Sequence, residues 1–333
     1  MAMDTIDSKR ELKSSRCGGN RSESGVALII VLLMIGIIIG VTVQLVRSSR
    51  SEYYDASNMR DRFKTVCLAK SGFYRAQTFL AQDDNNYDAL FEKWAQSEAI
   101  SAQASSLFDD GYFKVSIEDE SGKIPINKLV VNNDFNQPVK DLLIRLLTQP
   151  DFKLEAAQIT AIVNTIKDYL DADMEATGAE QGTGESVNYK NGPLDSLEEL
   201  LLIKGISEEL FYGTKEKPGI SAYLTIYGDG RVNINTAPRL VLKSLSAGLS
   251  DDQVARIEDF RKTDNRDLAD PGWYHRIIGT SGINIATDLI TVRSRVYRIV
   301  STGYLGKMTQ TVTGIVEKGE DPKAMKILSW KIS

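Results

Sequence analysis

Apolar residues dominate the chain from Val26 to Val46, and no charged side chain interrupts them. At a rise of about 1.5 Å per residue, a helix of this length crosses a hydrocarbon core of roughly 30 Å. A helix also pairs its backbone hydrogen-bonding groups internally, as a lipid environment requires. The pattern therefore predicts a transmembrane helix at 26–46.

Beyond this run, the hydrophobic pattern takes the period of one helical face. From Arg47 to about Gln82, apolar residues recur at steps of three and four positions, with charged residues between them. The recurring residues are Met59, Phe63, Val66, Cys67, Phe73, Ala76 and Leu80. An acidic and amide-rich segment at 83–86 ends the pattern. We predict one long helix at 26–82, whose first half lies in lipid and whose second half packs on a globular body.

Alternation with a period of two predicts the strands of that body. Residues 112–118 alternate between polar and apolar positions, and a turn signal follows at 119–123. Residues 222–235 have a strand pattern around a Gly-Asp-Gly turn, 288–317 favour two long strands, and 327–331 favour a last one. We therefore expect an antiparallel sheet built from 83–131, 222–235 and 287–333.

Helical periodicity returns between these strand segments. Residues 139–148, 154–170, 239–245 and 250–262 have apolar faces at helical spacing, and Ser196 with Glu199 forms the signature of a capping box. These helices interrupt the strands rather than following them. We expect an α-helical domain, made of 132–221 and 236–286, inserted into the sheet, which makes the fold class α+β.

Composition and charge place the chain among ordinary folded proteins. It has 333 residues, of which 42% are hydrophobic and 26% charged, and a net charge of −5 provides no global basic field for nucleic acid. Basic residues nevertheless gather before the apolar run, at Lys9, Arg10, Lys13, Arg16 and Arg21. Arg47 and Arg50 after the run weaken this bias. The bias places the leader in the cytoplasm and the body outside the inner membrane.

The two cysteines lie on either side of the apolar run. Cys17 lies before it, and Cys67 lies in the helical pattern after it. If the leader is removed, Cys67 is alone and the mature chain has no intramolecular disulfide. We expect Cys67 to be a small buried hydrophobic residue.

Three kinds of targeting segment are compatible with the start of the apolar run. A secretory signal peptide would have a shorter apolar region, of about 7–15 residues, and a small-residue cleavage site that Val43–Val46 does not provide. A plain signal anchor would need only the helix. The Ser24-Gly25 junction directly before Val26 resembles a prepilin signal, in which a peptidase cuts after the glycine. Residues 1–25 would then be the leader.

The fifth residue after Gly25 departs from the prepilin pattern, because it is Ile30 where prepilins usually carry Glu. A carboxylate in lipid is costly unless it is paired. In the pilin family its usual partner is the free amino terminus of a neighbouring subunit. A subunit without the carboxylate is best placed at the filament tip, where no subunit lies ahead of it.

Three further stretches carry a resemblance that extends over nearly the whole mature chain: 117–127, 167–173 and 232–238. With the departure at Ile30, they resemble the general secretion pathway protein K family, the minor pseudopilins of type II secretion. The resemblance implies a pilin-like fold with an inserted SAM-like domain and a place at the pseudopilus tip beside I- and J-type pseudopilins. It also implies cleavage by prepilin peptidase, methylation at Val26, and an inner-membrane anchor with the body in the periplasm.

An acidic segment follows the helix at 154–170. Its carboxylates are Asp168, Asp171, Asp173, Glu175 and Glu180. Calcium takes six to eight oxygen ligands from such groups, although the spacing is not that of an EF-hand. A solvated acidic loop is the alternative. The family resemblance implies calcium in the inserted domain, with Asp171 and Asp173 as the first candidates.

A second candidate site resembles a DNA-binding helix-hairpin-helix, formed by 235–238, Leu242, Gly248 and Arg261. It leaves a rival function open, a minor pilin of a type IV pilus or DNA-uptake system. Asp251 and Asp252 would repel phosphate there, so we expect no nucleic-acid partner. We also expect no enzyme, because the chain has neither a nucleophile-elbow nor a phosphate-loop motif.

Overall fold

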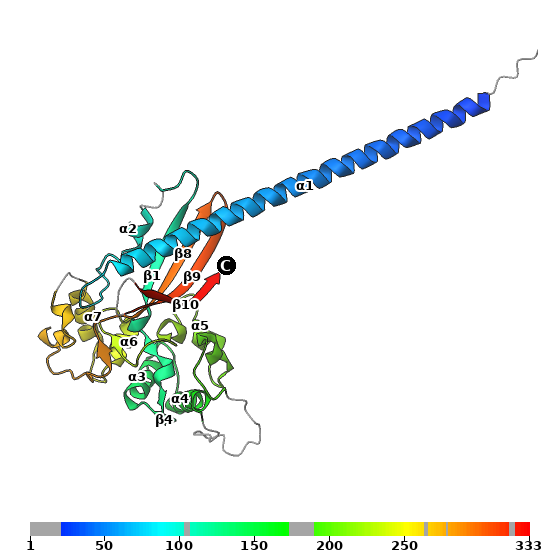
Figure 1. Cartoon of the computed structure of the whole chain (residues 1–333). Helices are drawn as coiled ribbons and strands as arrows, with labels where there is room; N and C mark the ends of the chain where they lie inside the picture. The colour runs from blue at the N-terminus through cyan, green and yellow to red at the C-terminus, as the bar shows by residue number, and fades with distance from the viewer. Residues whose placement is uncertain (1–20, 103–106, 173–189, 263–265, 278, 320–323) are drawn as a thin grey trace, which may run out of the picture. The chain divides into compact units, whose positions relative to one another are not determined.

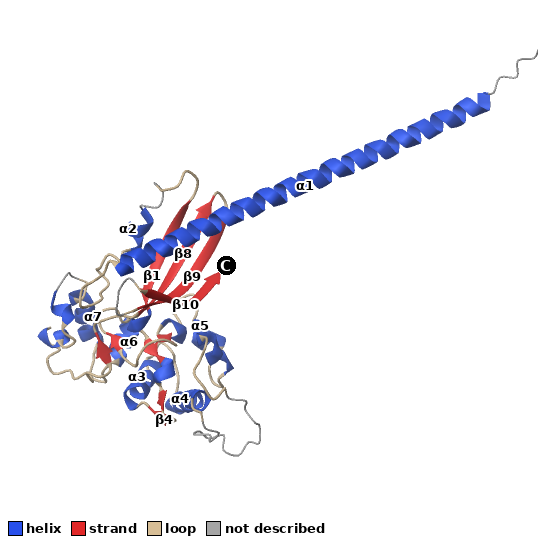
Figure 2. Cartoon of the chain, in the orientation of Figure 1, coloured by secondary structure: helices blue, strands red, loops and turns tan. Residues whose placement is uncertain are grey.

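The computed structural model describes residues 21–102, 107–172, 190–262, 266–277, 279–319 and 324–333. The chain divides into two compact units, Met1–Arg60 and Asp61–Ser333. One helix, α1 (Arg21–Ala81), begins in the first unit and ends in the second. Figure 1 follows the elements along the chain, and Figure 2 separates helices from strands.

The first unit contains the apolar part of α1. Large hydrophobic side chains from Val26 to Val46 are exposed, with Ile29 at 64% and Leu45 at 68%. The helix is long and apolar enough to cross a membrane, with a mean hydropathy of 3.2 over its most apolar window. The predicted helix is confirmed, and its length and composition match those of a membrane span.

The second unit contains a four-stranded antiparallel sheet in the order β1-β8-β9-β10. Its strands are β1 (Tyr112–Asp119), β8 (Val296–Leu305), β9 (Met308–Lys318) and β10 (Met325–Ile332). In β1, Phe113, Val115 and Ile117 are buried while the residues between them are exposed, which is the predicted period of two. The pairing Tyr112↔Tyr304 begins the β1–β8 register.

The part of α1 after Arg60 lies against one face of this sheet (Figure 1). Ala69, Phe73, Ala76 and Leu80 share a core with sheet residues that include Phe113 and Tyr297. Cys67, which we expected to be buried, is exposed, and Met59 and Phe63 are exposed as well. The contact face instead includes Thr65 and Gly72, because the close approach of helix and sheet selects small residues that a hydrophobic pattern does not mark.

Short helices and strands form the rest of the second unit. The α-helices are α2 (Ser97–Ala102), α3 (Gln137–Leu147), α4 (Ala156–Leu170), α5 (Glu208–Tyr212), α6 (Arg239–Ser244) and α7 (Asp251–Phe260). The 3-10 helices are η2 (Glu120–Gly122), η3 (Ile126–Lys128), η4 (Leu197–Leu202), η5 (Ile220–Ala222), η6 (Arg266–Ala269) and η7 (Trp273–Arg276). The two-residue strands are β2 (Ile124–Pro125), β3 (Val130–Val131), β4 (Asp134–Phe135), β5 (Leu224–Thr225), β6 (Val232–Asn233) and β7 (Ile290–Thr291).

These elements enclose a second and larger hydrophobic core. The predicted inner face of α4 is confirmed, since Ile159, Ile162 and Val163 are buried. The predicted capping box is also present, with Ser196 and Glu199 at the start of η4. The segment at 266–277 contributes Leu268, Trp273 and Tyr274 to the buried residues.

The prediction that 222–235 belongs to the antiparallel sheet is wrong. Its two short strands pair with different partners: β5 lies parallel to β2, and β6 lies parallel to β7. All four residues of β5 and β6 are buried, and Leu224 and Val232 belong to the larger core. A short run of alternating residues does not specify its partner, and here burial of both strands among the inserted elements decided the pairing.

Candidate functional site

The predicted processing junction lies on α1. The helix begins at Arg21, so the bond between Gly25 and Val26 is helical. Among the described residues, nothing besides the nearby helix backbone lies within 4 Å of a Cβ built on Gly25. Val26 is 57% exposed and Ile30 is 50% exposed. A peptidase that reads this junction would meet an apolar helical surface, with an isoleucine where a prepilin carries its carboxylate.

The predicted calcium ligands are described in part. Asp168 and Asp171 lie at the end of α4 and are buried, whereas Asp173, Glu175 and Glu180 lie outside the described residues. Asp171 Oδ2 accepts a hydrogen bond from Lys167 Nζ at 2.8 Å. Carboxylate oxygens are the donors that calcium takes, so these two residues fit the ion chemically. The ammonium of Lys167 already neutralises one of them.

A second cluster of carboxylates, separate from the predicted calcium ligands, lies where α1 meets the sheet. One carboxylate oxygen from each of Asp83, Asp88 and Glu92 lies within 4.8 Å of the others. The sequence marked Asp83 only as the end of the helix. The spacing of acidic residues from 83 to 92 indicated such a cluster only weakly. The loop conformation that brings the three carboxylates together depends on the tertiary structure.

Lysine and main-chain donors stabilise this cluster. Lys318 Nζ, from the end of β9, lies 3.1 Å from Asp83 Oδ2 and 4.0 Å from Asp88 Oδ1. Burial raises the pKa of Asp83 to about 6, and Lys318 opposes the shift. Burial also raises the pKa of Asp88 and of Glu92. Glu92 Oε2 accepts from the backbone of Ala89 at 2.7 Å and holds the loop closed.

Asp88 and Asp119 connect the sheet to the inserted elements. Asp88 accepts hydrogen bonds from the Ser294 backbone at 2.7 Å and from the Tyr297 hydroxyl. Asp119, at the end of β1, accepts from the hydroxyl groups of Thr236 and Ser294. Burial raises the pKa of Asp119 to about 6, although these donors oppose the shift. Two carboxylates thus join segments that are far apart in the sequence.

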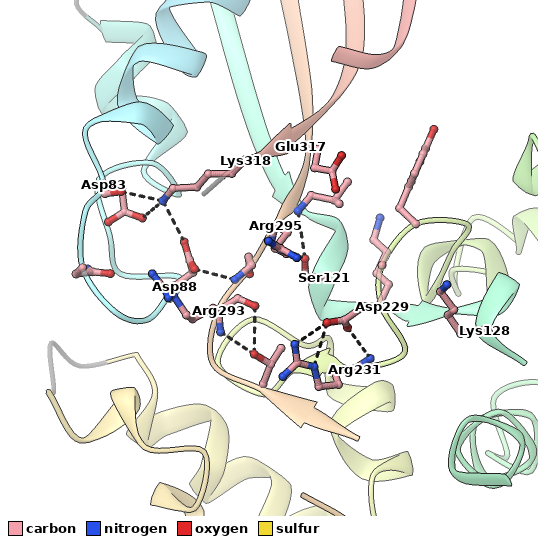
Figure 3. Close-up of a pocket in the computed structure, with 18 of the residues that line it drawn as sticks. Asp83, Asp88, Ser121, Lys128, Asp229, Arg231, Arg293, Arg295, Glu317 and Lys318 are labelled. Atoms are coloured by element: carbon pink, nitrogen blue, oxygen red, sulfur yellow. Dashed lines mark hydrogen bonds and ion pairs between the residues drawn. The ribbon is translucent and has the colours of Figure 1, made fainter. Parts of the chain in front are cut away.

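A cavity of about 700 Å³ opens beside this junction (Figure 3). Its wall is strongly charged, with Asp83, Asp88 and Lys318 at one end and Asp229 with Arg231 at another. Arg231 Nη2 lies 2.6 Å from Asp229 Oδ2. The cavity therefore lies between the end of the sheet and the inserted elements, and charged side chains from both line it.

The hairpin that resembled a DNA-binding motif is present as α6 and α7. Arg261, a candidate phosphate contact, is only 5% exposed, and its Nη1 donates to the carbonyl of Ala237 at 2.7 Å. Burial lowers its pKa to about 10. Lys243 pairs with Asp251 at 2.9 Å, and Arg239 pairs with Glu258. These cations hold the hairpin together, so the geometry lends no support to phosphate binding.

Comparison with known proteins gives one consistent answer. Residues 122–222 match the family model described as type II secretion system (T2SS), protein K. The chain is 26% identical over 320 residues to type II secretion system protein K of Pseudomonas aeruginosa, with 91% of each chain covered.

A solved structure supports the fold. The match is to a chain in the GspK-GspI-GspJ complex of the enterotoxigenic Escherichia coli type 2 secretion system, with a TM-score of 0.64 and 13% identity. It covers 84% of this chain and 99% of that one. The predicted fold, with a long N-terminal helix, an antiparallel sheet and an inserted helical region, is confirmed. The chain is thus similar in sequence to protein K of type II secretion systems, and in fold to a chain of the GspK-GspI-GspJ complex.

Proposed function

We propose that this chain is a minor pseudopilin at the tip of the type II secretion pseudopilus, where it starts or caps assembly and supports export of folded proteins. The observation that carries the proposal is the relationship to protein K of Pseudomonas aeruginosa over 91% of both chains. Because the match spans helix, sheet and inserted region together, it supports the same role for the whole molecule. We assign no catalytic step to it.

The tip position follows from Ile30 on α1. A subunit inside a filament must neutralise the amino terminus of its neighbour, and a carboxylate at this position serves that purpose. Ile30 offers no charge, so this position cannot form an ion pair with the amino terminus of a subunit ahead of it. A terminal subunit needs no such pair.

Minor pseudopilins of the I and J types are the proposed partners. The Escherichia coli chain that this fold matches was solved within the GspK-GspI-GspJ complex. In the present chain, Phe63 and Met59 remain exposed on α1, at 69% and 77%. Exposed apolar side chains on a pilin helix are suited to packing against neighbouring subunit helices.

Processing and location follow from the same helix. We propose that prepilin peptidase cuts after Gly25 and that the new amino end at Val26 is methylated. The helix at 26–46 would hold the chain in the bacterial inner membrane, with one span and with the body in the periplasm. The basic residues before the span support this orientation.

Calcium binding near the end of α4 is also a proposal. Asp168 and Asp171 would be two of its ligands, and the acidic residues that follow, Asp173, Glu175 and Glu180, would supply others. Calcium there would neutralise a run of like charges and tie the helix to the following loop.

Mass spectrometry of the chain purified from its own bacterium tests the processing step. We expect a mature protein that starts at Val26, and an intact leader in a variant whose Gly25 is replaced by Leu. Co-purification with the I- and J-type pseudopilins tests the tip role, with Ile30→Glu as the matched variant. An intact leader in the wild-type protein, or recovery without either partner, would overturn the proposal.

A further inference from the structure

Some basic side chains in the wall of this cavity have no acidic partner in the part of the chain that the structure describes. Six basic residues and five acidic residues line it. The basic ones are Lys123, Lys128, Arg231, Arg293, Arg295 and Lys318, and the acidic ones are Asp83, Asp84, Asp88, Asp229 and Glu317. Which of these charges have partners decides what the cavity can bind.

Three of the six basic side chains form ion pairs with acidic residues of the protein. Lys123 Nζ lies 2.9 Å from Glu120 Oε1, and Lys318 Nζ lies 3.1 Å from Asp83 Oδ2. Arg231 is bound to Asp229 through two nitrogens, Nε at 3.1 Å and Nη2 at 2.6 Å. Each of these cations is neutralised by its carboxylate partner, so the pairs present little net charge to the cavity.

The other three cations are Lys128, Arg293 and Arg295. Among the residues that the structure describes, their side chains make no hydrogen bond and no ion pair. Lys128 is half-buried, and both arginines are exposed at the cavity wall (Figure 3). Asp84 and Glu317 are the corresponding acidic residues without a partner in the described part of the chain.

The backbone of the two arginines is held in place. The Arg293 N–H donates to Thr291 Oγ1 at 3.1 Å, and the Arg295 N–H donates to Ser121 Oγ at 3.1 Å. Between them, Ser294 is buried, and its N–H donates to Asp88. This alternation turns the serine inward and leaves both guanidinium groups outside, on the wall of the same cavity.

We propose that this cavity binds the carboxylate groups of an acidic segment of a partner protein, held by Lys128, Arg293 and Arg295. Guanidinium groups bind carboxylates through two parallel hydrogen bonds. A volume of about 700 Å³ holds several side chains rather than a single ion. Glu317 and Asp84 on the same wall oppose an acidic ligand, so their removal tightens binding. The inference goes beyond the tip role and does not depend on it.

Fluorescence anisotropy on the full chain in neutral detergent at low ionic strength tests the proposal, because salt screens such contacts. The probe is a labelled hexaglutamate peptide, and a hexaglutamine peptide is the neutral control. We expect saturable binding of the acidic peptide only, weakened about tenfold or more by the double change Arg293→Ala and Arg295→Ala. Glu317→Gln should bind the peptide more tightly than the wild type.

Lys307→Ala serves as the matched control. Lys307 is an exposed cation in the turn between β8 and β9, at the end of β8 opposite to the cavity, and its loss should leave binding unchanged. Thermal unfolding shows whether each variant is folded.

Four results would overturn the proposal. They are equal binding of the neutral peptide, no loss in the folded double variant, no gain in Glu317→Gln, and complete displacement by low-millimolar inorganic phosphate. Displacement by phosphate would identify a phosphate site instead. Because the assay uses the chain alone, its failure leaves the proposed assembly role intact.

Discussion

Gly72 on α1 faces Ser301 on β8 so closely that a Cβ added to the glycine would lie 2.2 Å from the serine Oγ. The same Cβ would lie 2.7 Å from the ring of Phe113. On the sheet side, a Cβ at Gly303 would meet the carbonyl oxygen of Thr65 at 2.3 Å. The helix therefore rests on the sheet at points where neither element has room for a side chain.

Gly72→Ala should destabilise the protein. Alanine improves helix propensity by about 1 kcal/mol, but overpacking against Phe113 and Ser301 costs about 1–3 kcal/mol, and we expect a net loss of up to about 2 kcal/mol. Denaturant unfolding of the full chain in detergent measures it. Gly282→Ala is the control, because no described residue beyond its chain neighbours lies within 4 Å of its added Cβ. Equal stability of the two variants would contradict the close packing.

Arg261→Ala should also destabilise the protein, by about 2–3 kcal/mol, because the carbonyls of Ile234 and Ala237 lose a charged donor. The control is the neighbouring Lys262→Ala, whose lysine makes an exposed ion pair with Asp259. We expect its effect to stay within about 1 kcal/mol. If thermal unfolding finds the two variants alike, Arg261 does not support the hairpin.

Asp119 should make stability depend on pH. Its pKa in the folded protein is raised from 3.8 to about 6 by burial, so its contribution to stability is present below about pH 4 and is lost as the pH rises through 6. Relative to Asp119→Asn, which does not titrate, the wild type should lose stability between these values. Unfolding of both proteins in a buffer series measures the difference. A wild type that gains stability with rising pH, relative to the variant, would reverse the assignment.

Calcium bound at the proposed site near α4 should raise the unfolding temperature of the full chain. Ligand binding to the folded state alone stabilises it by about 2.7 kcal/mol at one hundred times the dissociation constant. The rise should vanish in Asp171→Ala and in Asp173→Ala. Glu92→Gln is the control, since Glu92 belongs to the other carboxylate cluster. Loss of the rise in Glu92→Gln, with the other two variants still responding, would place the ion at the junction of α1 and the sheet.

The sequence by itself determined the long helix, the strands β1, β8, β9 and β10, and the helices α3, α4, α6 and α7. Each has a local period that burial of one face imposes, and the apolar run at 26–46 needs no partner to be recognised. The proposed cleavage junction at Gly25 and the isoleucine at position 30 are likewise read from the residues alone.

Tertiary structure decided which short segments meet. The pairing of β5 with β2 and of β6 with β7, and the contacts of Lys318 with Asp83 and Asp88, join residues distant in the sequence. Tertiary packing also explains why Cys67 is exposed: the face of α1 that contains Gly72 lies against the sheet, and Cys67 is not on that face. Local patterns record how much of a segment is buried, whereas the identity of its neighbour depends on packing across the whole fold.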